Sequence, residues 1–576
     1  MSVESIITEN LDVWTSAIKT KSASGRGSSN KLKLYGIKKL RELILELAVR
    51  GKLVPQKSDE EDAHVLIKSI EQTKKELLAV EKIKKAKQLP EVIDTEEPYD
   101  LPVSWVWTRL GNLTEINPRN LVQDEGMNAS FVPMPLISTS FDGRHGTETR
   151  KWAEIKKGYT HFANGDIGLA KITPCFENSK AVVFSDLDNG IGAGTTELHI
   201  ARPYTKALNP NFVLLYLKSP IFLSEGESRM TGSAGQKRVP KEFFSSYPFP
   251  LPPSKEQERI VCKVTELMTL CDQLESQTEA SIEAHQTLVK SLLETLTNAK
   301  DADQLNESWR RISAHFDVLF TTEDSIDQLK QTILQLAVMG KLVKQDHNDE
   351  PASKLLERIA AEKEQLIKDK KIKKQKPLRA ITEDDCMFPL SDGWAWCRFG
   401  ELVSIQSELV SAIKYPEEYQ IAPDIIEKGT GQLLEKRTVK DSGAKGPNNR
   451  FYSGQILYSK IRPSLSKAII VDFDGLCSAD MYPMHSFINP EYLLKVILSE
   501  VFLNQVRTLE NRIKMPKLNI ESLSNIMVPL APLDQQQKIS DTVESMTSLG
   551  TKIQKSLVIR SLVVTALADS MLSGNV

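Results

Sequence analysis

The sequence predicts an α+β protein in which two mixed α/β globular domains are joined by long antiparallel helices or a coiled coil. Three observations predict this class. Residues 37–116 align without a gap with residues 326–405, and 31 of these 80 paired positions are identical. A second repeated boundary closes each domain, and the segments outside the domains carry apolar residues at helical spacing. A duplicated chain of this kind is expected to form a pseudo-twofold object.

The first repeat is centred on a predicted helix that ends at a glycine. The string ILELAVRGKLV at Ile44–Val54 pairs with ILQLAVMGKLV at Ile333–Val343. Gly51 and Gly340 stand where a residue with left-handed backbone geometry closes a helix. The same helix end is therefore predicted twice.

Charge-dense segments follow in both copies. Residues 74–87 and 363–376 alternate apolar and charged residues at helical intervals, which predicts a further helix in each copy. Both segments contain the string KIKK, at Lys82–Lys85 and Lys371–Lys374. The basic runs at Lys82–Lys87 and Lys370–Lys376 fit contacts with phosphate groups, a face that docks a partner, or a solvated helix end.

The second repeat marks the ends of the globular domains. FPLPPSKEQERIVCKV at 249–264 pairs with VPLAPLDQQQKISDTV at 528–543, so a proline-rich strand runs into a long helix twice. The domains are therefore predicted at residues 101–253 and 390–532. Both are rich in Gly, Pro and β-branched residues, and short alternating runs such as AVVFSDL and AIIVDFD are typical of strands.

The remaining regions, residues 1–100, 254–389 and 533–576, are predicted to be helical. The central region begins with the spacing of a coiled-coil seam, carried by Ile260, Val264, Leu267, Cys271 and Leu274. The C-terminal region resembles the first part of the central region, and the N-terminal region resembles its second part. The two ends are therefore expected to come together as a second copy of the central region, in a circular organisation with adjacent termini.

Composition excludes several classes of protein. A net charge of −2 with 26% charged residues argues against a polycationic binder. The six cysteines form no C-x-x-C pair, so neither a zinc site nor a redox motif is indicated. No basic-then-apolar leader opens the chain and no run of eighteen apolar residues occurs, so we expect a cytoplasmic protein without a membrane partner.

Motifs for catalysis are missing from the sequence. It contains no NPPY-like tetrad of amino-methyltransferases and no phosphate-binding G-x-x-x-x-G-K-[ST] loop. The glycine string GIGAG at Gly190–Gly194 runs directly into the strand-like TTELHI, which is not the strand–turn–helix context of a cofactor loop. The sequence therefore predicts a binding or scaffold protein and not an enzyme.

The order of these features resembles the specificity subunit of type I restriction–modification enzymes, in its larger variety, often called the B family. NGDIGLAKITPCFENSKAVV at Asn164–Val183 and GIGAGTTELHIARP at Gly190–Pro203 are similar to the family's target-recognition domain. The proline-rich exits followed by EQ-x-x-I, or here QQ-x-x-I in the second copy, are another family mark. In the second domain, GQILYSKIRPSLSKAII at Gly454–Ile470 lacks the FEN insertion, and CSADMYPM stands in place of TTELHI.

The resemblance implies that each globular domain reads one half of a bipartite target in double-stranded DNA. The helices would set the spacer between the halves and dock two methyltransferase subunits, and motor/nuclease subunits would complete a restriction complex. S-adenosylmethionine, ATP and magnesium would belong to the partner subunits, with no cofactor in this chain.

Candidate DNA contacts are polar and basic residues in glycine loops or in strand-like segments that recur in both copies. The loop TGSAGQKRVP, residues 231–240, is the strongest candidate, because its small residues allow close approach to a phosphate. The full set is Lys171, Thr173, Lys180, Gln236, Lys237, Arg238, Lys460, Arg462, Lys467, Arg512, Lys514 and Lys517. The alternative for each is an ordinary solvated side chain.

Three other readings stay open at the level of sequence. A duplicated adaptor could use its globular domains to bind proteins or peptides. A self-contained restriction–methylation enzyme would need a catalytic domain that the motifs do not reveal. A specificity subunit could also serve a methylation-only or phage-defence complex.

Overall fold

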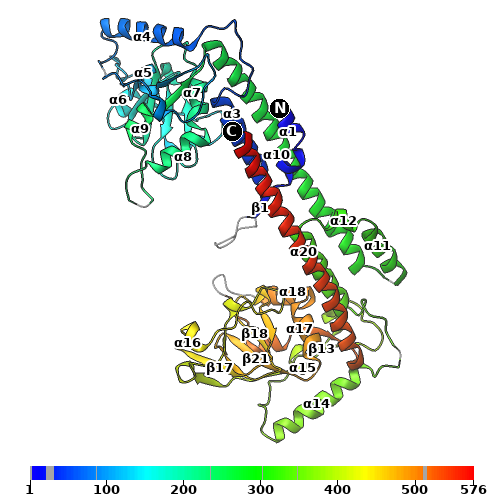
Figure 1. Cartoon of the computed structure of the whole chain (residues 1–576). Helices are drawn as coiled ribbons and strands as arrows, with labels where there is room; N and C mark the ends of the chain where they lie inside the picture. The colour runs from blue at the N-terminus through cyan, green and yellow to red at the C-terminus, as the bar shows by residue number, and fades with distance from the viewer. Residues whose placement is uncertain are drawn as a thin grey trace. The chain divides into compact units, whose positions relative to one another are not determined.

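The structure is a computed structural model that describes residues 3–20, 32–85, 87–233, 235–300, 302–346, 348–509 and 516–575 (Figure 1). The chain divides into two compact units, Met1–Ser281 with Arg560–Val576, and Ile282–Ile559. Helices α10 (Ser254–Thr297) and α20 (Leu533–Asn575) contribute residues to both units. Each unit contains one sheet-rich domain, which confirms the predicted α+β class.

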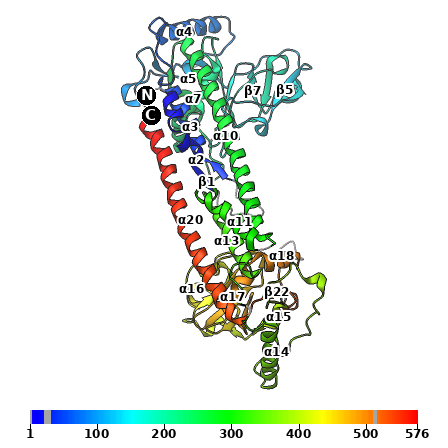
Figure 2. The same cartoon turned by 90° about the vertical axis from the view of Figure 1, so that its right-hand side faces the viewer.

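The sheet-rich domain of the first unit contains ten strands. They form the sheets β6-β5-β10-β7 and β4-β11-β8-β9 and the pair β12-β3, and Figure 2 shows β5 and β7 of the first sheet from the side. The strands are β3 (Val106–Arg109), β4 (Thr114–Ile116), β5 (Asn128–Val132), β6 (Glu148–Lys151), β7 (Thr160–Ala163), β8 (Ile167–Ala170), β9 (Ala181–Val183), β10 (Ile191–Gly194), β11 (Leu198–Pro203) and β12 (Pro248–Leu251). The helices are α5 (Leu110–Leu113), α6 (Trp152–Ile155), α7 (Pro210–Leu217), α8 (Pro220–Ser228) and α9 (Lys241–Ser246).

The sheet-rich domain of the second unit contains the sheets β15-β17-β20-β16 and β14-β21-β18-β19 and the pair β13-β22. It repeats most of this plan, but its edge strand β15 pairs with β17, the equivalent of β7, whereas β6 pairs with β5. Its strands are β13 (Ala395–Arg398), β14 (Val403–Ile405), β15 (Leu409–Ser411), β16 (Gln420–Ile421), β17 (Pro447–Phe451), β18 (Ile456–Ser459), β19 (Ala468–Ile470), β20 (Gly475–Ser478), β21 (Met481–Ser486) and β22 (Met527–Leu530). The helices are α15 (Phe399–Leu402), α16 (Val439–Ser442), α17 (Pro490–Leu498), α18 (Glu500–Leu509) and α19 (Ile520–Ser524).

Helices make up most of the remaining described chain. Before the first sheet-rich domain lie α1 (Val3–Thr8), α2 (Leu11–Ser16), the strand pair β1 (Ile18–Thr20) and β2 (Leu32–Leu34), α3 (Tyr35–Val49) and α4 (Ala63–Ala79). Between the two domains lie α10, α11 (Ala302–Ala314), α12 (Phe316–Leu319), α13 (Glu323–Val338) and α14 (Ala352–Lys368). The predicted glycine ends of α3 and α13 are confirmed, since φ is +69° at Gly51 and +75° at Gly340.

The charge-dense segments are only partly helical, so the prediction of helices over 74–87 and 363–376 is wrong in their second halves. Helix α4 ends at Ala79 and α14 ends at Lys368. Glu81 and Lys370, which are equivalent in the repeat, both have left-handed backbone geometry, with φ of +57° and +56°. A left-handed residue interrupts an α-helix, so the lysines that follow lie outside the helices.

The glycine string at Gly190–Gly194 serves packing in a sheet. Residues Ile191–Gly194 form β10, which pairs parallel with β5 and antiparallel with β7. A Cβ atom on Gly192 would lie 2.5 Å from the Ser130 carbonyl oxygen, and one on Gly194 would lie 2.3 Å from that of Val132. Only glycine fits so close to a neighbouring strand, which explains the string without a cofactor.

The two ends of the chain meet within the first unit. The Tyr35 hydroxyl on α3 donates a hydrogen bond of 2.7 Å to Asp569 on α20, and Lys39 lies 3.6 Å from the same carboxylate. The Ser561 hydroxyl donates to the carbonyl of Ile18 on β1. The predicted circular organisation, with the N-terminal and C-terminal helices side by side, is therefore confirmed.

The repeated EQ-x-x-I and QQ-x-x-I motifs share one structural role. The side-chain amide of Gln257 donates to the Pro252 carbonyl at 2.9 Å and accepts from the Asn209 backbone N–H at 2.7 Å. Gln536 makes the same two contacts, to the Ala531 carbonyl and from the Asn489 N–H. Both glutamines are fully buried. Each one ties the start of a long helix to the cap of a helix in the adjacent domain.

Replacing Gln257 by alanine is expected to destabilise the start of α7 by about 1–3 kcal/mol, because it leaves two buried backbone groups without partners. Amide hydrogen exchange of Asn209 and the first turn of α7 would measure the loss. The exposed neighbour Glu258 supplies the control, since Glu258→Ala removes no such contact. Equal protection in both variants would contradict the role given to Gln257.

Candidate nucleic-acid interface

The candidate loop of the first domain ends in an arginine held by a carboxylate. The Arg238 Nε and Nη2 atoms donate to the two carboxylate oxygens of Glu197, each at 2.9 Å. Its Nη1 atom donates to the Gln236 carbonyl at 3.2 Å. The Arg238 side chain is still 43% exposed, so the remaining N–H groups face solvent. Such a fixed, planar and exposed guanidinium suits a base edge or a phosphate.

Backbone hydrogen bonds place this ion pair at the end of strand β8. The N–H of Lys171, just after β8, donates to the Glu197 carbonyl at 3.0 Å, and the N–H of Val239 donates to the Lys171 carbonyl at 2.8 Å. The N–H of Thr173 donates to the carbonyl of Lys237 at 3.0 Å. Three segments that are distant in sequence therefore meet where the inner strand β8 ends.

The second domain contains the same arrangement. Lys517 lies 3.1 Å from the Asp480 carboxylate, and Lys460 lies 3.7 Å from it. The Lys460 N–H donates to the Asp480 carbonyl at 3.0 Å, and the Leu518 N–H donates to the Lys460 carbonyl at 2.8 Å. Arg462 donates its N–H to the Pro516 carbonyl, as Thr173 does to Lys237.

We call these two groups the recognition clusters. The first consists of Lys171, Glu197 and Arg238, and the second of Lys460, Asp480 and Lys517. Their bridging contacts are also equivalent, since Ile172 pairs with Arg238 and Ile461 pairs with Lys517. The duplicated fold therefore presents a carboxylate with two basic neighbours at the same place in each domain.

The two charged side chains Glu197 and Arg238 of the first cluster also shift each other's pKa. The Arg238 guanidinium, which is hydrogen-bonded to Glu197, lowers the pKa of this carboxyl group. Glu197 in turn raises the pKa of Arg238. Both groups therefore stay ionised at neutral pH, and a DNA phosphate would meet a basic side chain that is already partly neutralised.

The remaining candidates in the first domain differ in their surroundings. Gln236 and Lys237 are exposed on the loop. The hydroxyl of Thr173 is buried and has no partner among the described residues. The Lys180 ammonium donates to the Met134 carbonyl at 2.9 Å, which ties the chain to a 3-10 helix at Met134–Leu136.

The remaining candidates in the second domain also include a lysine bound to a backbone carbonyl and an exposed residue. The Lys467 ammonium donates to the Pro423 carbonyl, at the 3-10 helix Pro423–Ile425, and burial lowers its pKa. Arg462 is exposed and has left-handed backbone geometry, with φ of +45°. Arg512 and Lys514 lie outside the described residues. Lys180 and Lys467 are thus equivalent anchors between elements. The Lys460 ammonium also donates to a backbone carbonyl, that of Ala479 at 2.6 Å, so the exposed residues and the other basic residues of the two clusters remain for a ligand.

Sequence reasoning missed both carboxylates of the recognition clusters. Glu197 lies within TTELHI and Asp480 within CSADMYPM, two strings that the repeat already set opposite each other. The signal available in the sequence was that each of these two paired strings contains one acidic residue. The equivalence was hidden because the offset between the two copies is not constant. It is 289 residues for Lys171 and Lys460, 283 for Glu197 and Asp480, and 279 for Arg238 and Lys517.

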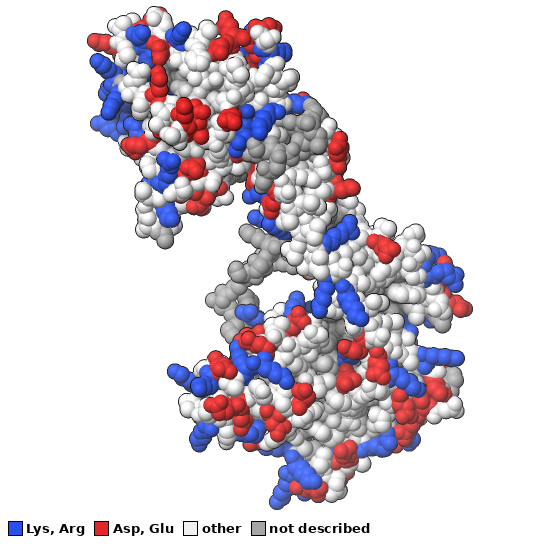
Figure 3. All heavy atoms as spheres, viewed as in Figure 1, with Lys and Arg blue, Asp and Glu red and all other residues white. Residues whose placement is uncertain are grey.

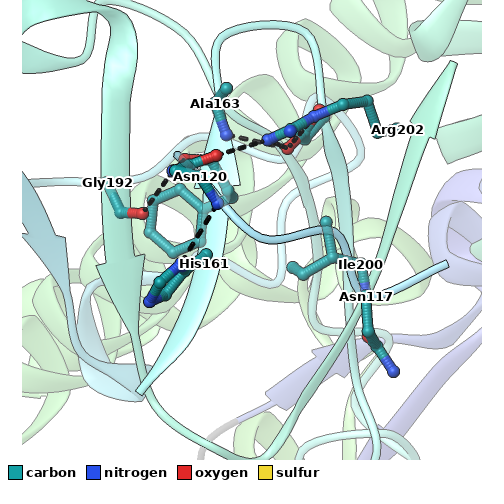
Figure 4. Close-up of polar contacts among 9 residues, drawn as sticks. Asn117, Asn120, His161, Ala163, Gly192, Ile200 and Arg202 are labelled. Carbon is teal, nitrogen blue, oxygen red and sulfur yellow. Dashed lines mark hydrogen bonds and ion pairs between the residues drawn. The ribbon is translucent and has the colours of Figure 1, made fainter. Parts of the chain in front are cut away.

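A buried polar network joins the two four-stranded sheets of the first domain (Figure 4). The Arg202 guanidinium on β11 forms an ion pair of 2.8 Å with Asp166 and also donates to Asn120. The Asn120 amide donates to the Phe162 carbonyl on β7 at 2.8 Å. Burial raises the pKa of Asp166, and the hydrogen bond from Arg202 opposes this rise. The network fixes the sheet that carries the first recognition cluster.

Charge elsewhere on the viewed face is mixed, with acidic and basic side chains interspersed over both units (Figure 3). Within the described residues, no group of three or more His, Cys, Asp or Glu side chains could hold a metal ion. The described helices also include none that is long and apolar enough to cross a membrane. The basic side chains on the viewed face therefore do not form one continuous patch.

Comparisons with known proteins bear on the family of the chain. The family model for the type I restriction modification DNA specificity domain matches residues 102–284 and 393–558. The chain is 47% identical to the type I restriction enzyme EcoAI specificity subunit of Escherichia coli, covering 96% of each chain. It is also 47% identical to the EcoEI specificity subunit of the same species, covering 99% of each. A crystal structure of the HsdS subunit from Thermoanaerobacter tengcongensis aligns with a TM-score of 0.42 at 16% identity, over 84% of this chain and 98% of that one.

Proposed function

The chain belongs to the family of type I restriction–modification specificity subunits, and from this membership we propose that each recognition cluster contacts one half of a bipartite DNA target. The observation that carries the proposal is the duplicated cluster of two basic residues around one carboxylate. Its backbone geometry is the same in both domains, while the side chains differ. Two clusters with the same backbone geometry and different side chains suit two half-sites with different base sequences.

The partners follow from the same membership. As a specificity subunit, the chain binds DNA and associates with methyltransferase subunits, and we propose two of these, one on each copy of the helical region. Motor/nuclease subunits would complete a restriction complex. S-adenosylmethionine, ATP and magnesium would be held by the partners, and this chain would be non-catalytic and cytoplasmic. A non-DNA adaptor is not favoured, because the family match covers both sheet-rich domains.

Replacing Glu197 by glutamine tests the role of the first cluster. The variant frees the Arg238 guanidinium and removes a negative charge beside it, so attraction to any phosphate should increase. We expect the affinity of the assembled complex for non-target duplex to rise roughly 3- to 10-fold at low salt, which corresponds to about one added phosphate contact. Discrimination between target and non-target should fall by a similar factor, as measured by competition binding.

Glu177 provides the matched control, because it is exposed in the same domain and has no ion pair among the described contacts. Glu177→Gln changes the net charge equally and should leave discrimination unchanged. If Glu197→Gln and Glu177→Gln behave alike, the cluster does not touch DNA. A wild-type complex that shows no preference for any duplex would contradict the proposed function itself.

A further inference from the structure

Four lysines follow each of the helices α4 and α14, which we call the arms, and we call these two groups of lysines the basic straps. The first strap consists of Lys82, Lys84, Lys85 and Lys87 after α4, and the second of Lys371, Lys373, Lys374 and Lys376 after α14. All eight side chains are exposed. Of these, only Lys376 has a polar side-chain partner among the described residues, Glu521 at 3.0 Å. The charges of the straps are therefore almost entirely unneutralised.

The strap residues are identical in the two copies, whereas the exposed residues of α4 and α14 differ. Nine positions of α4 and α14 are exposed in both copies, for example Lys75 and its equivalent Glu364, and all nine carry different residues. The identical positions within these helices, such as Leu66 and Leu355, are buried or half-buried. By contrast, all four exposed strap positions are lysine in both copies. Packing cannot explain identity at exposed positions, so a shared ligand is the simplest cause.

An arginine clamp fixes each strap against its sheet-rich domain. Arg109 donates to the carbonyls of Pro90 and Glu91 at 2.7 and 3.1 Å, and forms an ion pair of 2.6 Å with Glu96. Arg109 is only 5% exposed. The N–H of Leu89 also donates to the Asn112 side chain at 3.1 Å. The residues directly after the first strap are thus held against β3 and α5 of the first sheet-rich domain.

The second strap is fixed in the same way. Arg398 donates to the carbonyls of Arg379 and Ala380 and forms an ion pair of 2.7 Å with Asp385. Gln375, between two strap lysines, donates to the Val403 carbonyl at the start of β14. A preorganised lysine row loses less conformational freedom on binding than a mobile one.

We propose that the basic straps bind the DNA phosphate backbone next to each half-site. The phosphate backbone has the same chemistry at both half-sites whatever their base sequences, so it would keep two straps alike while the recognition clusters diverge. A protein partner fits less well, because lysine is depleted from protein interfaces. This inference rests on the proposed function, since it requires a complex that binds duplex DNA.

The test compares two variants of the assembled complex that lose the same charge. One carries Lys82→Gln, Lys85→Gln, Lys371→Gln and Lys374→Gln in the straps. The other carries Lys68→Gln, Lys75→Gln, Lys354→Gln and Lys368→Gln on the exposed faces of the arms. Binding to target and non-target duplex is measured over a range of salt concentrations.

The strap variant should flatten the dependence of log affinity on log salt by about 0.9 for each lysine that touches a phosphate, so by roughly 3 to 4 in total. Target and non-target affinities should fall together, and the arm variant should match the wild type. An unchanged slope in the strap variant would overturn the inference. Failure of the strap variant to copurify with methyltransferase subunits would also overturn it and assign the straps to protein docking. In both cases, a wild-type complex that still selects its target would leave the proposed function intact.

Discussion

Replacing Arg238 by alanine is expected to lower the affinity of the assembled complex for its target about 5- to 150-fold. The guanidinium is fixed by both Glu197 oxygens and remains 43% exposed, so its free N–H groups are positioned before DNA arrives. Such a preorganised group contributes more to binding than a flexible lysine, because little side-chain entropy is lost. The loss should therefore exceed that of any single exposed lysine in this domain.

The second half-site supplies the matched control for Arg238. Lys517 occupies the equivalent place beside Asp480. Arg238→Ala should relax base preference in one half of the target only, and Lys517→Ala should weaken binding through the other half. Competition binding with duplexes substituted in one half at a time separates the two effects. Equal relaxation of both halves by either variant would contradict the assignment of one cluster to each half-site.

Replacing Arg398 by alanine is expected to destabilise the local structure around β13 and β22 by about 1–3 kcal/mol, chiefly through the carbonyl acceptors that lose their donor. The side chain donates to the Arg379, Ala380 and Asn525 carbonyls. It also neutralises Asp385 at 2.7 Å. Its removal leaves several acceptors and one carboxylate without their partner inside a largely buried site.

Amide hydrogen exchange of β13 and β22 in the full chain measures this loss without assuming two-state unfolding. Exchange there should accelerate about 5- to 150-fold, since 1.4 kcal/mol corresponds to a factor of ten. Arg109→Ala should do the same to β3 and β12 in the first unit, because Arg109 makes the equivalent contacts to Pro90, Glu91 and Ser246. Unchanged exchange in both variants would show that the clamps are dispensable.

The sequence predicted the duplicated architecture because the repeat is strongest where packing constrains it. Ile44 and Leu47 and their equivalents face the interior, and the glycines that end α3 and α13 need positive φ. The circular arrangement followed from segment resemblance, and Tyr35 and Asp569 confirm it. The predicted helices over 74–87 and 363–376 failed in their second halves, because helical periodicity does not register a single left-handed residue such as Glu81.

The candidate interface was predicted less completely. Lys171 and Lys460 were found because they stand 289 residues apart, the same offset as in the gapless repeat, and their backbone contacts with Glu197 and Asp480 were not visible. Insertions and deletions in each domain change the offset between copies, so a residue on another strand loses its sequence equivalent. Lys180 and Lys467 were chosen for their charge, yet each ammonium donates to a backbone carbonyl. Charge and spacing alone do not distinguish an anchor from a ligand contact.

The most direct test of the central claim is a genome-wide map of N6-methyladenine in the host strain, with the wild-type gene, without it, and with Arg238→Ala. If the two recognition clusters of one chain each contact one half-site, the map should contain a bipartite motif with a fixed gap. This motif should disappear when the gene is deleted. Arg238→Ala should broaden the accepted sequence in one half of that motif and leave the other half and the gap unchanged. A motif that persists after deletion, or that consists of one continuous sequence, would contradict the account.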